Sequence, residues 1–166
     1  MVIRNVTSSD IPSIVQIYNH YIATTTISFE EIPVTIKEME KRVEQVLSLG
    51  FPWIVLEQYG EVKGYAYANQ WKARSAYRFT VEPSIYVDAD AKGKGLGKAL
   101  YGELLEILKR AGYKNAVGSI ALPNQPSVAL HERMGFKKVG EFNNIGFKFD
   151  HQISVGYWQL ELNNGY

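Results

Sequence analysis

The stretch AKGKGLGKALY, residues 91–101, places three glycines at alternate positions among three lysines and runs directly into a helical pattern. Glycine lets the backbone turn tightly, and a helix that begins at Leu96 presents free N–H groups and the positive end of its dipole to the loop. The stretch therefore predicts a binding site for an anion, best suited to a pyrophosphate, where a strand ends and a helix begins. For the loop taken alone, a solvated glycine-rich turn is the alternative.

Two common phosphate-binding loops do not fit this spacing. A Walker A loop reads G-x-x-x-x-G-K-[ST], but Gly93 to Gly97 is one residue short and Ala99 stands where the hydroxyl belongs. A dinucleotide fingerprint needs glycine where Lys98 stands, near the start of a βαβ unit, and this loop lies past the middle of the chain. The formal net charge of +1 argues against a nucleic-acid partner bound through a basic surface.

The composition narrows the class of protein further. A length of 166 residues favours one domain with a hydrophobic core, and we expect a single domain over residues 1–166. The chain has no cysteine, which excludes disulfides, thiolate metal sites and a cysteine nucleophile. Three scattered histidines without ligand spacing predict no metal site. Without a signal-peptide pattern or an apolar run of membrane length, we expect a cytoplasmic protein with no membrane contact.

Hydrophobic periodicity predicts the element order βααβββαβαββ. An early antiparallel meander followed by a β-α-β unit predicts a mixed α/β sheet with helices on both faces. The expected helices cover residues 8–22, 35–50, 96–112 and 124–135. The expected strands cover residues 2–6, 53–58, 62–71, 78–87, 114–122, 136–142 and 154–162.

A glutamate lies inside the apolar strand TVEPSIYV, residues 80–87. Alternate strand residues share a face, so Glu82 lies on the side of Ser84 and Tyr86. Pro83 has no N–H group, which a central strand tolerates only at a bulge or where neighbouring strands part. A carboxylate at such an irregularity, close to the anion loop, is a candidate general base. A salt-bridged structural glutamate is the alternative.

A second polar group of residues follows the next strand, in LPNQPSVALHERMGF. Asn124 and Ser127 stand at a strand-to-helix turn, and His131 lies on the short helix. A lone histidine on a helix is more often structural than catalytic, so the residues alone leave both roles open for His131.

Together these segments resemble the GNAT superfamily of acetyl-CoA-dependent N-acetyltransferases. Its acyl-CoA loop, Q/R-x-x-G-x-G/A, reads here as Lys92-x-x-Gly95-x-Gly97, with lysine keeping the positive charge. The predicted element order matches the family's fold, in which the central strands splay apart. The longer strings NHYIATTTISF, WKARSAY, TVEPSIYV, LPNQPSVALHE and VGYWQL are similar to the phosphinothricin N-acetyltransferases. Members of that family acetylate glutamate-like amino acids such as phosphinothricin and methionine sulfoximine.

The resemblance implies that acetyl-CoA gives its acetyl group to the α-amine of phosphinothricin, methionine sulfoximine or methionine sulfone. It makes Glu82 the base and His131 the donor to the leaving thiolate, and the lack of cysteine favours direct transfer in a ternary complex. It assigns acetyl-CoA binding to Ile85, Tyr86, Val87, Lys92, Gly93, Lys94, Gly95, Leu96, Gly97, Lys98, Asn124 and Ser127. It assigns substrate binding to Phe29, Arg74, Tyr77 and Val155. It also implies a homodimer, with residues 154–163 as a plausible interface strand.

One region departs from the family pattern. Its members commonly carry W-x-D-V after a G-x-K string, and this chain keeps Gly146 and Lys148 but has Gln152 and Ser154 in place of the Trp and Asp. The departure bears on the acceptor and leaves the acetyl-CoA site unaffected.

Two other functions remain compatible with the sequence. One is a GNAT enzyme for another amine or for a protein N-terminus. Arginines just before the candidate catalytic strand favour a small anionic acceptor instead, because arginine binds carboxylates and phosphinates through two hydrogen bonds. The other is a module that senses acetyl-CoA without catalysis, and the presence of both Glu82 and His131 argues against it.

Overall fold

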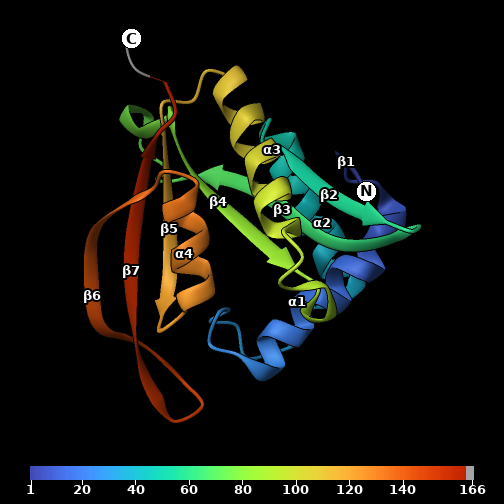
Figure 1. The fold of residues 1–166 in the computed structure, drawn as a ribbon, viewed down its shortest axis with the longest axis horizontal. Coiled ribbons are helices and arrows are strands. Elements are labelled where there is room, and N and C mark those ends of the chain that lie inside the picture. The colour runs from blue at the N-terminus through green and yellow to red at the C-terminus, as the bar shows by residue number, and fades with distance from the viewer. Residues whose placement is uncertain (164–166) are drawn as a thin grey trace.

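The computed structural model describes residues 1–163, and its helices and strands follow the predicted order βααβββαβαββ (Figure 1). The elements are β1 (Val2–Asn5), α1 (Ile11–Thr24), α2 (Ile36–Ser48), β2 (Trp53–Gln58), β3 (Glu61–Gln70), β4 (Thr80–Val87), α3 (Leu96–Arg110), β5 (Asn115–Leu122), α4 (Gln125–Arg133), β6 (Lys137–Lys148) and β7 (His151–Glu161). Short 3-10 turns lie at Ser8–Asp10, Ser75–Tyr77 and Ala89–Ala91. The expected mixed α/β class is confirmed.

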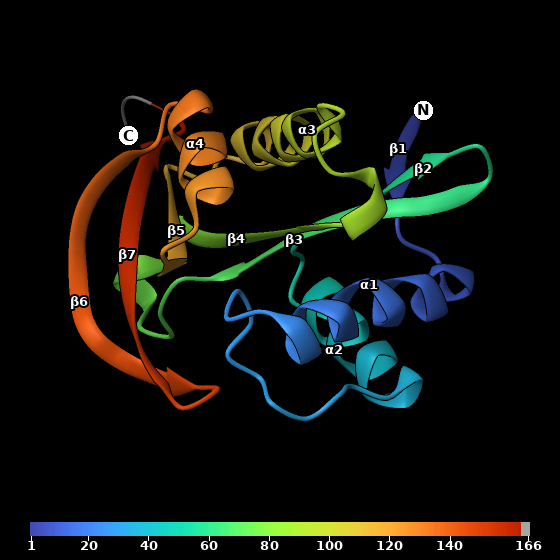
Figure 2. The ribbon, with the colours of Figure 1, turned by 60° about the horizontal axis from the view of Figure 1, so that its bottom comes forward.

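The strands form a seven-stranded sheet in the order β1-β2-β3-β4-β5-β7-β6. Every neighbouring pair is antiparallel except β4 and β5, which run parallel. Figure 2 shows α1 and α2 on one face of the sheet and α3 and α4 on the other. Both expected layers of helices are therefore present, and the parallel pair lies in the middle of the sheet.

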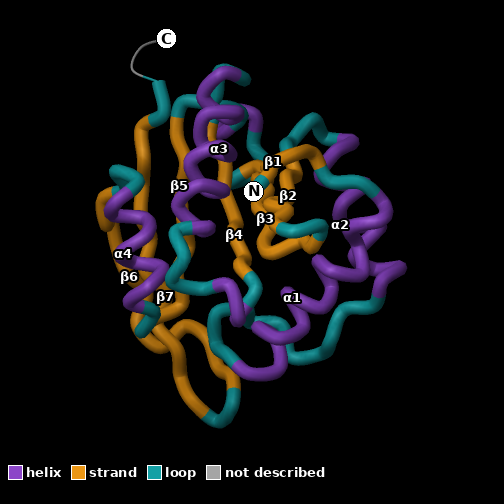
Figure 3. Tube along the Cα trace, turned by 45° about the vertical axis from the view of Figure 1, so that its right-hand side comes forward, coloured by secondary structure: helices purple, strands orange, loops and turns teal. Residues whose placement is uncertain are grey.

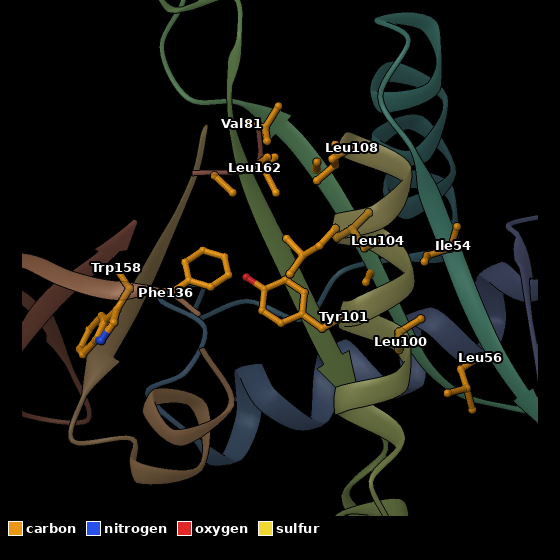
Figure 4. Packing of buried hydrophobic residues seen from close by; sticks show 14 of the residues in the cluster. Ile54, Leu56, Val81, Leu100, Tyr101, Leu104, Leu108, Phe136, Trp158 and Leu162 are labelled. Atoms are coloured by element: carbon orange, nitrogen blue, oxygen red, sulfur yellow. The ribbon is translucent and has the colours of Figure 1, made fainter. Parts of the chain in front are cut away.

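Two hydrophobic cores lie on the two faces. Strand side chains alternate between faces, so the buried run WIVL of β2 sends Ile54 and Leu56 to one core and Trp53 and Val55 to the other. Figure 4 shows the α3 side, where the leucines of the helix pack on the sheet. Each fully buried aliphatic side chain there contributes roughly 1.5–3 kcal/mol. This packing fixes the start of α3 relative to the end of β4.

The C-terminal hairpin is longer than the sequence pattern predicts. The strand expected over residues 136–142 continues to Lys148, and the next begins at His151 rather than at residue 154. Figure 3 shows β6 and β7 continuing as a two-stranded ribbon past the end of β5. The pairing of β6 with β7 shifts register at two places, and nearly all side chains of β6 are exposed. The strand therefore lacks the regular alternation of apolar and polar residues by which a strand is predicted.

Candidate active site

The two central strands part in the middle of the sheet. β4 and β5 pair only at Thr80 with Asn115 and at Val81 with Ala116, although β4 runs on to Val87 and β5 to Leu122. Figure 1 shows the two strands diverging from that point. The parting begins at the residue before Pro83, as the missing proline N–H predicts. Beyond these two pairs, the facing edges of β4 and β5 are not hydrogen-bonded to each other.

Glu82 is the first residue of β4 beyond the last paired position. Its side chain is half-buried, and burial raises the pKa of its carboxyl group above the usual 4.5, against the lowering effects of the Lys72 charge and a hydrogen bond with Ser119. Ser119 lies on β5, across the gap. A raised pKa moves a carboxylate toward the range in which a general base works near neutral pH. The structure therefore places a carboxylate with a raised pKa at the point where the gap begins.

His131 is buried, with 5% of its surface exposed, and both ring nitrogens have partners. Nδ1 lies 2.8 Å from the Ser127 carbonyl oxygen, which only accepts, so Nδ1 carries the hydrogen. Nε2 is then the acceptor for the Tyr101 hydroxyl at 3.0 Å. Burial lowers the pKa of His131, which favours this neutral form. A Cβ atom at Gly118 would lie 2.7 Å from the ring, so the histidine packs directly on β5.

Tyr101 is a site residue that sequence reasoning missed. It lies on the buried face of α3 among leucines, where its spacing resembles an ordinary core position. The signal for a special role is the hydroxyl, because a buried tyrosine needs a hydrogen-bond partner. Burial raises the pKa of Tyr101, and the negative charge of Glu82 raises it further. Tyr101 therefore interacts with Glu82 through its charge and with His131 through a hydrogen bond.

The glycine-lysine loop joins the end of β4 to α3. Gly93 and Gly95 have φ angles of 78° and 76°, a left-handed conformation that side chains rarely adopt. Gly95 is the N-cap of α3 and supplies no side-chain hydrogen bond, so the first N–H groups of a 15-residue helix lack a side-chain cap. Lys92, Lys94 and Lys98 are exposed around this helix start, while Leu96 is buried. The loop thus has the tight turn and the uncapped helix start on which the anion-site prediction depends.

The other predicted acetyl-CoA residues flank the gap. Ile85, Tyr86 and Val87 lie on the part of β4 beyond its pairing with β5, but the Val87 carbonyl already accepts the Tyr21 hydroxyl at 2.5 Å. Beyond β5, the Asn124 side chain caps α4 by accepting the backbone N–H of Ser127 at 3.2 Å. Asn124 and Ser127 thus have local structural roles, and Ser127 also orients His131.

The predicted substrate residues come from three separate segments. Phe29 lies half-exposed in the connection between α1 and α2, and its ring meets Gly146 of β6. Arg74 and Tyr77 lie exposed on the connection between β3 and β4. Trp71 in the same connection packs edge-on against Tyr157 of β7, 6.0 Å between ring centroids. Val155, two residues before Tyr157, is buried.

These contacts place the first two segments against the β6–β7 hairpin, which carries the third. Figure 2 shows the connection between α1 and α2 reaching toward that hairpin. The two positions that depart from the family pattern lie there too. The Ser154 hydroxyl accepts the backbone N–H of Asn144 at 3.0 Å and so supports the irregular part of β6, and Gln152 pairs with Phe147.

A polar cavity of about 260 Å³ lies between α2 and the β2–β3 strands. Its wall includes Trp53, whose indole Nε1 is buried without a hydrogen-bond partner in residues 1–163. It also includes Asn69, which pairs with Glu82 across β3 and β4. None of the four predicted substrate residues lines this cavity, so it is distinct from the segments described above.

Two features are absent from residues 1–163. No group of three His, Cys, Asp or Glu side chains there is arranged to hold a metal ion. No helix in that part of the chain is both long and apolar enough to cross a membrane.

Comparisons with known proteins agree with this geometry. Residues 3–155 match the family described as "Acetyltransferase (GNAT) domain". The chain is 42% identical over 160 residues to a phosphinothricin N-acetyltransferase of Streptomyces viridochromogenes, covering 96% of this chain and 87% of that protein. It is 35% identical to an L-methionine sulfoximine/L-methionine sulfone acetyltransferase of Pseudomonas aeruginosa, covering 96% and 94%. An acetyltransferase structure from Salmonella typhimurium, solved with its cofactor acetyl-CoA, superposes with a TM-score of 0.97 at 32% identity, covering 100% and 96%.

Proposed function

Because this chain belongs to the GNAT acetyltransferase family, we propose that it moves the acetyl group of acetyl-CoA to the α-amine of a small glutamate-like amino acid. Phosphinothricin, methionine sulfoximine and methionine sulfone are the acceptors that the names of its relatives suggest. The observation that carries the proposal is Glu82, a half-buried carboxylate with a raised pKa at the point where β4 and β5 part. The exposed Arg74 beside this strand suits an anionic acceptor.

Acetyl-CoA is held in this proposal by the end of β4 and the start of α3. The uncapped N–H groups after Gly95 and the exposed Lys92, Lys94 and Lys98 complement a pyrophosphate. The free edge of β4 over Ile85–Val87 offers backbone groups to amides, as a strand offers them to an added strand. The left-handed φ angles of Gly93 and Gly95 support this assignment, because they give the loop a tight turn at the start of α3.

The reaction needs the acceptor amine in its neutral form. Glu82 takes one proton from the α-ammonium, directly or through water, and the freed nitrogen attacks the thioester carbonyl. The nitrogen loses its second proton as the C–N bond forms and the C–S bond breaks. One of these two protons ends on the CoA sulfur, and the other leaves to solvent.

The sulfur receives its proton through Tyr101 rather than from His131 directly. Within residues 1–163, Nε2 of His131 is hydrogen-bonded to the Tyr101 hydroxyl alone, and Nδ1 is held by Ser127. Nε2 carries no proton at rest, so it first takes one of the two protons that the amine releases; Tyr101 then passes its own proton to the sulfur and takes the one from Nε2, so charge and protons balance. His131 is then a positioning and relay residue behind Tyr101.

A thiol-release assay with acetyl-CoA and a panel of amines tests this function. We expect CoA release with phosphinothricin, methionine sulfoximine and methionine sulfone, and little with neutral peptides or polyamines. Release with peptides alone would instead indicate acetylation of protein N-termini. Tight acetyl-CoA binding with no release by any amine would indicate a sensing module.

We also propose that the protein is a homodimer, built on β6 rather than on the interface strand expected over residues 154–163, because β7 is paired on both edges, with β5 and with β6. The edge strand β6 exposes large apolar side chains on its outer part, at positions Val139, Phe142, Ile145 and Phe147. Such a row on an unpaired edge is a typical protein–protein contact. Sedimentation equilibrium should give a dimer for the natural chain and a monomer for Ile145→Glu. A natural chain that sediments as a monomer would contradict the proposal.

A further inference from the structure

Lys148, the last residue of β6, is almost completely buried, with 1% of its surface exposed. Its ammonium group donates to the carbonyl oxygens of Ile22 at 2.8 Å and Ser28 at 2.7 Å. The same nitrogen lies 5.0 Å from the centroid of the Phe149 ring. A buried charge is costly unless it is hydrogen-bonded, so the two carbonyls explain how this lysine is tolerated.

The two carbonyl groups bracket a short segment that follows α1. Ile22 is one of the last four residues of α1, whose carbonyl groups lack partners within the helix, and a cation there also complements the helix dipole. Ser28 lies just before Phe29, and its hydroxyl accepts the backbone N–H of Glu30 at 3.2 Å. One ammonium group therefore ties both ends of residues 22–28 to the end of β6.

The hairpin contacts this segment at a second point. The ring of Phe29 packs so closely on Gly146 that a Cβ atom there would lie 2.5 Å from its Cε2 atom. Phe142, on the same strand, pairs with Val155 of β7. β6 thus holds one predicted substrate residue, Phe29, and is hydrogen-bonded along its length to the strand that carries another, Val155.

We propose that Lys148 is a positioning residue for the acceptor, because it fastens the segment that bears Phe29 to the β6–β7 hairpin that bears Val155. The inference rests on the proposed function for the identity of the acceptor. Lys148 makes no contact with the glycine-lysine loop. Within residues 1–163, the hydrogen bonds and ring contacts of that loop involve other residues. The loss of Lys148 should therefore weaken acceptor binding and leave acetyl-CoA binding unchanged.

Lys148→Met tests the proposal, because methionine keeps the length and the apolar stem but removes the donors. Lys138→Met is the matched control on the same strand, where the lysine is exposed and its ammonium group contacts Glu141 and the Trp158 ring. We expect the acceptor KM to rise about tenfold in Lys148→Met, because a change of that size corresponds to the loss of a charged hydrogen bond. The kcat and the Kd for acetyl-CoA should stay close to the control. An acceptor KM equal to that of Lys138→Met, or an equal loss of acetyl-CoA affinity, would overturn the proposal.

Gly146→Ala provides a second test if Lys148→Met does not fold. The added methyl group must displace the Phe29 ring, whereas Gly140→Ala on the same strand meets no atom within 4 Å. We expect a higher acceptor KM for Gly146→Ala than for Gly140→Ala, with the same Kd for acetyl-CoA. Equal acceptor KM values for the two variants would contradict the proposal.

Hydrogen exchange separates this inference from the proposed function. Amides in residues 23–32 should exchange faster in Lys148→Met than in Lys138→Met, while amides in α3 should be unaffected. If no amino acid is acetylated by the natural chain, the proposed function fails but this measurement still tests the attachment. Unchanged exchange in residues 23–32 would overturn the role of Lys148.

Discussion

The two sides of the proposed reacting centre are built in different ways. The acetyl-CoA side comes mainly from one continuous run, from Glu82 on β4 through the glycine-lysine loop to the first turn of α3. The acceptor side is assembled from the connection after α1, the connection before β4 and the β6–β7 hairpin, joined by contacts such as Lys148 to Ser28, 120 residues apart. Binding of the two ligands should therefore respond to different substitutions.

The largest effect is expected at Glu82, which lies where the two sides meet. Glu82→Gln keeps the shape of the side chain but removes the base, so we expect kcat to fall by about 10²–10⁴-fold. The Kd for acetyl-CoA should stay unchanged, since the amide still fits the strand. Steady-state kinetics and calorimetric titration with acetyl-CoA measure the two quantities. Unchanged turnover would exclude Glu82 as the base and support the salt-bridged alternative.

The pH profile sharpens the same test. A base acts when deprotonated, so kcat/KM should fall as pH drops through the pKa of Glu82, which burial raises above 4.5. The hydrogen bond with Ser119 lowers that pKa, so Ser119→Ala should move the acidic limb of the profile to higher pH. In Glu82→Gln this limb should disappear. If the acidic limb of the profile stays in place in both variants, it reports the titration of a group other than Glu82.

Tyr101→Phe comes next, and it should affect turnover more than either binding constant. The substitution removes the hydroxyl from Nε2 of His131 and interrupts the relay to sulfur, so we expect kcat to fall roughly 10–100-fold. Combined with His131→Gln, the loss should be smaller than the product of the two single losses, because both residues act in one relay. Fully multiplicative losses would show that the two act separately.

A smaller effect, on acetyl-CoA binding alone, is expected at the N-terminus of α3. Gly95→Ala places a side chain at a φ of 76°, which costs about 1–2 kcal/mol and should weaken acetyl-CoA binding about tenfold by distorting the loop. Gly112→Ala is the control, because its φ of 88° imposes similar strain just beyond the other end of α3. The acceptor KM should be the same in both variants. Equal acetyl-CoA affinities would mean that the loop conformation does not matter for binding.

The acetyl-CoA side was predictable because its signals are local. Each of these signals lies within a few residues: the three glycines, the strand containing Glu82 and Pro83, and the helix beginning at Leu96. The structure begins α3 at Leu96 as expected and ends it at Arg110, two residues before the expected end. The alternation of β4 also predicted its faces, with Ile85 and Val87 toward α3 and Tyr86 toward α1.

The rest of the site depends on contacts that no local pattern contains. The pairing of Tyr101 with His131 joins residues 30 apart, and a tyrosine in a leucine stripe resembles ordinary core. Lys148 resembles a surface lysine until the segment after α1 folds over it. The register shifts in β6 hid half of that strand from the period-2 pattern.

The smallest effect on activity is expected at Asp10, which belongs to neither side. Its carboxylate is 3% exposed and receives both terminal nitrogens of Arg4 at 2.8 Å, so Arg4 lowers the pKa of Asp10. Asp10→Asn should reduce the free energy of unfolding by about 1–3 kcal/mol, the cost of a broken buried charged hydrogen bond. Because the folded pKa is lowered, this stability is present above the unfolded pKa of about 4 and is lost as pH falls through the folded value.

Chemical denaturation between pH 3 and 7 should therefore show that the stability difference between Asp10→Asn and the natural chain shrinks at the acidic end. Glu44→Gln, at an exposed position on α2, should show no such difference. Both the acceptor KM and the acetyl-CoA Kd should stay unchanged in Asp10→Asn, because the ion pair touches neither ligand's segments. If Asp10→Asn weakened only one ligand, that side of the site would depend on the stability of the β1–α1 junction, and the separation of the two sides would be incomplete.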